Sequence, residues 1–424
     1  MNNFNKTYSN TFQPHPLQQN SQDYLLYKKY VSIHSEDRDI LAYPNSCEFE
    51  IELPEDITNI STIKLSDWAL PSNYYTFSVL NNNITMYFKI INPYNPSLNG
   101  YTNQLRISIY NALINYNNIQ LIQNVDDSKG YYKIDIEEGF YNPTELTTEL
   151  TNKFNESVTK VINDYLIENH LNDQLIEFQL KGGYTNFVIV YNNVSQKIWF
   201  GNRLDAFELS NEVVFLNYTF NNNSICKRNM LPDFSNWGLP SNIGLTRKNE
   251  TSVPPIDPIY NYVRFYYGNV FNNDNGVWLT PATDELGVIL PGAVVQFIEC
   301  PYKINIFGPS HIYMEVYKYN SIDETVPYNI NGFTLTTNET NGIVNSAFAK
   351  IPIISTPLTQ YYDGPADAYK FFNPPIERIR KLKFKFRYHN GVMVDFGIFP
   401  YTFTLEFTTL LPMINRAVKF VDNI

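Results

Sequence analysis

Two pairs of adjacent acidic residues, Asp126-Asp127 and Glu137-Glu138, are the first candidates for chemistry in this 424-residue chain. Glycoside hydrolysis needs two carboxyl groups that face each other across a cleft, one of them acting as the general acid. Sequence neighbours in a loop do not provide that arrangement. These pairs are therefore more typical of solvated loops than of a hydrolase.

The histidines, cysteines and tryptophans are too scattered to form a catalytic or metal-binding motif. The sequence contains no phosphate-binding glycine loop, no HExxH motif and no Gly-x-Ser-x-Gly turn. We therefore expect no catalytic residue, no metal and no cofactor. We interpret these side chains as structural, or as core and interface residues: His15, His34, His170, His311, His389, Cys47, Cys226, Cys300, Trp68, Trp199, Trp237 and Trp278.

Two rows of like charge are more informative, because each lies on the polar side of an alternating pattern. Three interpretations are open: two solvated faces, which we place first, a stripe that contacts a partner, or two rows that pair with each other. Cross-strand ion pairs would contribute a few tenths of a kcal/mol each. The rows form the candidate partner-contact stripe: Glu48, Glu50, Glu52, Lys381, Lys383, Lys385 and Arg387.

The basic row belongs to the clearest β pattern in the chain, residues 378–407. Apolar and basic residues alternate strictly from Lys381 to Tyr388, as in a half-buried strand. The sequence His389-Asn390-Gly391 then suits a tight hairpin turn. Further alternation follows at 392–396 and 402–407. The pattern predicts three consecutive strands whose apolar face must be covered by the rest of the chain.

Other segments predict many short strands and one amphipathic helix. Asn142, Pro143 and Glu145 form a helix start, and apolar residues recur at helical spacing up to Tyr165. Residues 92–130 show no regular pattern. Ordered structure begins with residues 24–26 and 30–33, and strands are predicted at 47–53 (ended by Pro54), 60–70, 84–91, 131–137, 187–191, 197–200, 294–299, 312–319 and 347–354.

This pattern predicts a mainly β protein, a jelly-roll-type β-sandwich with long loop insertions and one helix at about 143–165. We divide the chain into a flexible N-terminal arm at 1–23, a β-sandwich portion with the helix at 24–245, and a second β portion at 246–424. The second portion forms either a separate jelly roll or completes the first sandwich. Because sandwiches commonly pair distant strands, segment 378–407 is a candidate to lie beside the N-terminal strands.

Charge and composition limit the partners. The net charge of −11 argues against nucleic acid, because neutralising phosphates needs a basic surface. An aromatic content of 16% favours strands. Three widely spaced cysteines indicate folding in a reducing compartment. The sequence shows no signal-peptide pattern and no segment apolar enough to span a bilayer as a helix.

Four segments occur together in a recognisable order. They are a charged loop with two strands at 35–75, a strand entering the helix at 136–150, the Asn-Trp-Gly-Leu-Pro turn at 236–245, and the C-terminal strands at 342–407. In order and co-occurrence they resemble the minor capsid proteins of nucleocytoplasmic large DNA viruses, the giant viruses of protists and algae. The resemblance covers most of residues 30–410, and no single segment is a strict signature.

The resemblance implies a structural β-sandwich protein that bridges capsomers of the major capsid protein in an icosahedral shell. Its partners would be the major capsid protein, other minor capsid proteins and, peripherally, the internal viral membrane, within a large symmetric assembly. It would reside in the virion capsid and assemble in the host cytoplasm. The alternatives are a receptor- or glycan-binding sandwich module of the virion and, less favoured, a β-sandwich hydrolase.

Overall fold

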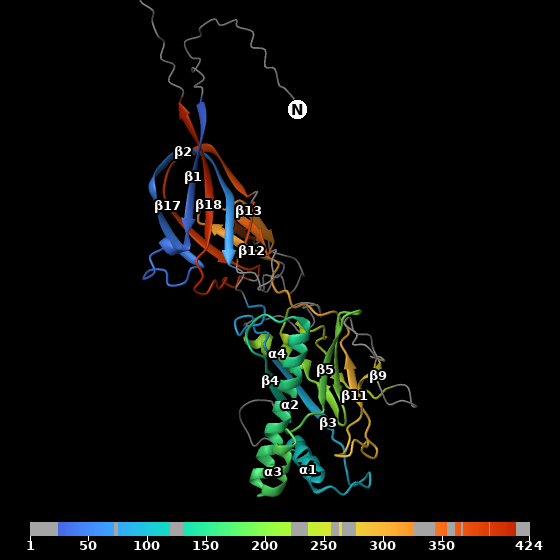
Figure 1. Cartoon of the computed structure of the whole chain (residues 1–424). Helices are drawn as coiled ribbons and strands as arrows, with labels where there is room; N and C mark the ends of the chain where they lie inside the picture. The colour runs from blue at the N-terminus through green and yellow to red at the C-terminus, as the bar shows by residue number, and fades with distance from the viewer. Residues whose placement is uncertain are drawn as a thin grey trace, which may run out of the picture.

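The computed structural model describes residues 24–71, 75–118, 130–221, 236–255, 263–264, 277–325, 344–353, 361–365, 368–389 and 391–412. Strands hold 41% of the residues and helices 21%, which confirms the prediction of a mainly β protein. The elements gather in two units, one made of long strands and one that contains the helices (Figure 1). The predicted arm, residues 1–23, lies outside the described residues.

The long-strand unit is built on β2, Glu48–Pro71, which pairs along both edges. All its described pairings are antiparallel. The sheet has seven strands in the order β1 (Tyr24–His34), β18 (Thr402–Pro412), β2, β17 (Tyr369–Arg387), β12 (His311–Val316) and β15 (Ala349–Pro352), with β16 (Tyr361–Pro365) also paired to β2.

Strand β2 joins two segments that the sequence predicted as separate strands. Pro54 does not end the first of them. On the neighbouring β17, Lys381 lies opposite Glu52 and Ile379 lies opposite Ile57, so β2 carries extra residues between these two pairs. Pro54 falls within this bulge, where a residue without a backbone N–H does not interrupt the ladder.

Segment 378–407 does lie beside the N-terminal strands, but not as three consecutive strands. Strands β17 and β18 occupy opposite edges of β2. The predicted return strand after the turn is reduced to a bridge between Arg387 and Met393. Asn390 of the predicted turn lies outside the described residues, and Gly391 has the positive φ of 84° that favours glycine.

One hydrophobic core belongs to this sheet. It contains Val31 and Ile33 from the first strand as well as Ile312 and Ile351 from the last two strands. Residues from both ends of a seven-stranded sheet can share one core only if the sheet curls around it. Figure 1 shows this curvature, with the long strands bowed around the interior of the unit. The smaller pair β13 (Ile322–Thr325) and β14 (Val344–Ala347) lies near β12.

The second unit packs helices on two small antiparallel sheets. The sheets are β4 (Tyr132–Asp135), β3 (Thr85–Asn92), β7 (Ala206–Leu209) and β8 (Glu250–Thr251), and β11 (Gln296–Glu299), β6 (Lys197–Asn202) and β5 (Phe187–Asn192). The pair β9 (Val263–Arg264) and β10 (Val277–Leu279) stands apart. The helices are α1 (Gln104–Asn118), α2 (Pro143–Glu168), α3 (Asn172–Leu180), α4 (Asn211–Asn221) and α5 (Leu239–Asn242).

Helix α2 confirms the predicted helix and its start. Asn142 and Glu145 form a reciprocal capping box, in which each side chain accepts a hydrogen bond from the backbone N–H of the other residue. The ring of Phe154 stacks on Phe88, 4.2 Å away, at the centre of this unit's core. The other helices were not predicted. In α1 only one narrow face is buried, and Ile and Tyr on the remaining faces obscure the helical period.

The two cores divide the chain differently from a boundary at residue 245. The helical unit's core includes residues on both sides of that position, from Phe77 to Ile306. The curled sheet takes its residues from 31–70 and 312–407. The helical unit is thus an insertion between β2 and β12. Residue 245 therefore does not separate the two hydrophobic cores.

Candidate functional site

The two predicted charge rows face each other across the β2–β17 pairing. Lys381, Lys383 and Lys385 lie opposite Glu52, Glu50 and Glu48 in the register. The ion pairs run diagonally: Lys383 Nζ lies 2.6 Å from Glu48 Oε1, Lys381 Nζ 3.4 Å from Glu50 Oε1, and Arg380 Nη2 2.6 Å from Glu52 Oε1. The third interpretation, mutual pairing, is therefore the one the structure shows. A partner contact of the same stripe stays a prediction.

These ion pairs lie on the outer face of the sheet, where their side chains are 37–58% exposed. The hydrogen bond from Arg380, together with its charge, lowers the pKa of Glu52. The hydrogen bond to Glu48 raises the pKa of Lys383 despite slight burial. Solvent screening keeps the contribution of such pairs to stability small.

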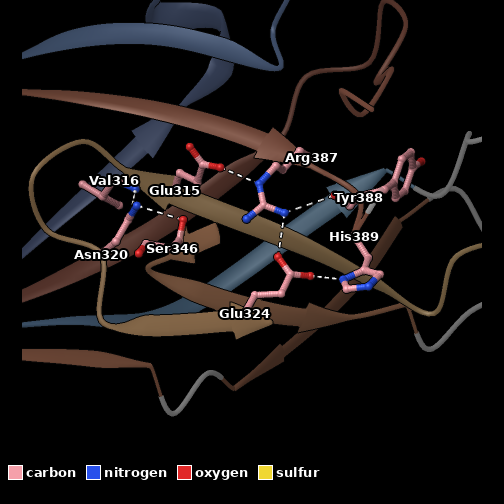
Figure 2. A network of polar contacts seen from close by, with 8 residues as sticks. All are labelled: Glu315, Val316, Asn320, Glu324, Ser346, Arg387, Tyr388 and His389. Carbon is pink, nitrogen blue, oxygen red and sulfur yellow. Dashed lines mark hydrogen bonds and ion pairs between the residues drawn. The ribbon is translucent and has the colours of Figure 1, made fainter. Parts of the chain in front are cut away.

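Arg387 differs from the rest of the basic row, because it is buried rather than solvent-facing. Its side chain is 3% exposed. Figure 2 shows its guanidinium between Glu315 of β12 and Glu324 of β13. Nε donates to Glu315 Oε1 over 2.5 Å, and Nη1 donates to Glu324 Oε2 over 2.8 Å. The alternating pattern of β17 correctly places Arg387 on the outer face of the sheet. At this end of β17 the outer face is covered by β13, so the side chain is buried.

Glu324 is the acceptor at the centre of this buried network. Its second carboxylate oxygen, Oε1, contacts Nδ1 of His389, whose ring lies largely in solvent (Figure 2). Burial alone would raise the pKa of Glu324, but hydrogen bonds from His389 and Arg387 outweigh burial and lower it. Asn320 holds the β12–β13 turn in place by accepting from Val316 N and donating to Ser346 O.

Three other histidines, His34, His170 and His311, lie in surroundings that fit a structural role. His34 contacts Ser32, and His170 follows helix α2 with a positive φ of 56°. His311 contacts Ser310 over 2.8 Å; burial and the nearby Lys350 lower its pKa. His15 lies outside the described residues.

The described cysteines are not placed for catalysis. Cys47 and Cys300 are buried in different cores. Burial raises the pKa of both thiols, which disfavours the reactive thiolate. Cys226 lies outside the described residues.

The acidic pairs do not form a catalytic dyad among the described residues. Glu138 Oε1 accepts a hydrogen bond from Val79 N, and the Glu137 carbonyl accepts one from Tyr141. Asp126-Asp127 lies outside the described residues. In the part of the chain that the structure describes, no group of three or more His, Cys, Asp or Glu side chains could hold a metal ion.

A cavity of about 230 Å³ between α1, α3 and the 283–285 loop is lined by charged groups. Three of its four charged side chains have partners: Lys181 Nζ lies 2.6 Å from both Glu177 and Glu285, and Asp284 accepts from two backbone N–H groups. Such pairing leaves no pair of carboxylates facing each other for hydrolysis.

The three tryptophans whose side chains the structure describes do not gather into a sugar site. Trp68 and Trp237 are buried in separate cores, and Trp199 stacks on Phe297 with ring centroids 5.5 Å apart. The side chain of Trp278, in β10, is outside the described residues. This agrees with the structural interpretation of the three described tryptophans.

A continuous run of exposed apolar side chains lies along an edge of the curled sheet. We define the β1–β18 ribbon as residues 24–30 of β1 with residues 406–412 of β18, which pair from Tyr24 opposite Pro412 to Tyr30 opposite Glu406. The last pair between β18 and β2 is Thr409 with Ile60, so residues 410–412 of the ribbon lie beyond the part of β18 that pairs with β2. Figure 1 shows the paired ends of β1 and β18 projecting beyond the sheet.

Large side chains on this ribbon are 43–64% exposed: Tyr24, Leu25, Leu26, Tyr27, Tyr30 and Leu411. Two lysines interrupt the apolar row, and each is ion-paired within the chain. Lys28 Nζ lies 2.7 Å from Glu406 Oε1, and Lys29 pairs with Glu55. A hydrogen bond and the charge of Glu406 raise the pKa of Lys28. The ribbon was not identified from the sequence, although the uninterrupted run of large residues at 24–27 marks it.

None of the helices in the described part of the chain combines the length and apolar character needed to cross a membrane. No family model and no curated protein matches the sequence. Among solved structures, the chain is similar to one from the Sputnik virophage, studied by cryo-EM, with a TM-score of 0.36, 12% identity, and 91% of this chain and 98% of that chain covered. It is also similar to the mavirus penton protein, with a TM-score of 0.36, 9% identity, and coverage of 92% and 100%.

A double-mutant cycle tests the charge ladder. Lys383→Ala, Glu48→Ala and the double variant should give a coupling free energy of about 0.2–1 kcal/mol, because the pair is solvent-exposed. Urea unfolding of the four proteins measures it, and the coupling should shrink in high salt. A coupling near zero at low salt would contradict the pairing.

The buried network predicts a pH dependence. At pH 7, Glu324→Gln should lower the free energy of unfolding by about 1–3 kcal/mol, because Arg387 loses one charged partner while Glu315 still balances its charge. The folded pKa of Glu324 lies below its ordinary value of 4.5, so the unfolded state takes up the proton first as pH falls. The wild-type advantage is therefore complete at neutral pH and is lost as pH falls below about 5.

Chemical denaturation at neutral and acidic pH measures this change. Glu36→Gln, which alters an exposed carboxylate in the short helix Ser35–Asp37, is the control and should change stability little at either pH. An equal deficit for Glu324→Gln at pH 7 and below pH 4 would show that its ionisation does not stabilise the fold.

Proposed function

We propose that this protein is a structural component of the icosahedral shell of a large DNA virus, a minor capsid protein that bridges capsomers of the major capsid protein. The sequence resemblance suggests this class. The β1–β18 ribbon is the observation that best supports an assembly role. The proposal places the protein in the virion, with the major capsid protein and other minor capsid proteins as partners and peripheral contact with the internal membrane.

The ribbon has the features of a binding surface rather than of an ordinary surface strand. Single exposed apolar residues are common, but contiguous ones usually mark interaction sites. Tyrosine, which supplies three of the exposed ribbon residues, is enriched at interfaces. The strands continue into a sheet whose central strand is paired along both edges, so the ribbon is held in position before a partner binds.

The remaining candidates for chemistry favour assembly over turnover. In the described residues, the acidic side chains of the cavity and the side chain of Glu138 already have hydrogen-bond or ion-pair partners, and both thiols are buried. The described tryptophans are divided among separate clusters. These contacts give no support to a hydrolase or to a glycan-binding cleft in this part of the chain.

Cross-linking mass spectrometry on purified virus particles tests this proposal. A lysine-reactive reagent should yield cross-links from Lys28, which is 59% exposed on the ribbon, to other shell proteins. The control is the isolated protein treated with the same reagent, because links found in both samples lie within the chain or between its copies. Absence of the protein from particles, or its presence only in traces without links to shell proteins, would contradict the proposal.

A further inference from the structure

Strand β1 is the terminal strand of its sheet. It pairs with β18, and no other strand of the described residues lies along its second edge. The backbone N–H and C=O groups along such an edge can pair with a strand from another molecule. What distinguishes this edge is the order of its side chains.

Residues 24–30 read Tyr-Leu-Leu-Tyr-Lys-Lys-Tyr; reversed about Tyr27, this sequence places tyrosine opposite tyrosine and leucine opposite lysine. From this pattern we infer that two copies of the chain pair antiparallel through β1, with a two-fold axis at Tyr27, so that their sheets become continuous. In this register Tyr24 lies opposite Tyr30 of the second copy, Leu25 opposite Lys29, Leu26 opposite Lys28, and Tyr27 opposite Tyr27. This inference goes beyond the proposed shell function.

Two-fold symmetry restricts the register in which the two β1 strands can pair. A two-fold axis perpendicular to the joined sheet places directly opposed side chains on the same face, so the axis must pass through a residue and not between two. An axis at Lys28 or Lys29 would bring like charges directly opposite each other, which is destabilising. An axis at Tyr27 avoids this and forms aromatic cross-strand pairs, which are among the favourable ones.

The lysines of β1 would ordinarily protect an edge against pairing. Here each lysine already has a carboxylate partner in its own chain, Glu406 for Lys28 and Glu55 for Lys29. These ion pairs neutralise the positive charges before a second copy binds. In the proposed register the aliphatic stem of each lysine packs beside a leucine of the second copy, which suits its amphipathic side chain. The interface would be isologous, as in most homodimers.

Changing the charge at residue 26 tests the register. Leu26 is 64% exposed, so substitution should leave each copy folded, which circular dichroism checks. Leu26→Lys would oppose Lys28 of the second copy twice per dimer, and Leu26→Glu would pair with it twice. Sedimentation equilibrium of the full chain should show a wild-type dimer, a dissociation constant raised about tenfold by Leu26→Lys, and a dimer retained by Leu26→Glu.

Leu80→Lys is the matched control, because Leu80 is 64% exposed, like Leu26, and lies outside β1; it should leave the dimer unchanged. A wild-type chain that stays monomeric at its highest soluble concentration would overturn the inference. Equal weakening by Leu26→Lys and Leu26→Glu, or no effect of either, would also overturn it. These outcomes leave the shell proposal standing, because that proposal is judged on intact particles.

Discussion

The structure depends on the backbone pairing of β2 with strands from the other end of the chain. Strand β17 pairs with β2 between Glu48 and Lys64 along one edge, and β18 pairs with it between Ile60 and Ala69 along the other. Each pairing closes a very long loop. The entropy of closure rises only slowly with loop length, about 0.6 kcal/mol for each doubling, so a folded insertion between β2 and β12 is tolerated. The helical unit occupies that insertion and has its own core.

The same pairing determines which charged side chains meet on the outer face of the sheet. Once β2 and β17 are in register, the glutamates of one strand meet the lysines of the other, and the ladder adds electrostatic specificity to a register already fixed by the apolar face. At the end of β17, β13 covers the outer face of the sheet. A charged side chain buried there needs partners of opposite charge. Arg387 has two such partners, Glu315 and Glu324. The lysines of the row thus form exposed ion pairs, whereas its arginine forms buried ones.

Local patterns predicted the elements better than their arrangement. Strict alternation identified the strands around Glu50 and Lys383, and a capping box identified the start of α2, because both signals lie within a few residues. The union of two segments into β2 was missed because Pro54 usually ends a strand, and only the partner strand reveals the bulge. Helix α1 was missed because one narrow buried face gives a weak period.

The candidate site shows the same limit. Each charge row was visible in the sequence, but whether the rows meet depends on which strands are neighbours. Burial of Arg387 depends on β13, whose residues 322–325 lie far from β17 in the chain. The ribbon likewise becomes evident only when the end of β18 is seen to pair with β1 beyond its last pair with β2. Long-range pairing, which no local pattern encodes, decides all three features.

Hydrogen–deuterium exchange measured by mass spectrometry would test most directly whether β2 is held by both C-terminal strands. Amides of β2, β17 and β18 should share the slowest exchange in the long-strand unit, because opening any one of them requires the sheet to unfold. Mild denaturant should accelerate all three together. If β18 or β17 exchanged much faster than β2, the pairing that organises this account would be contradicted.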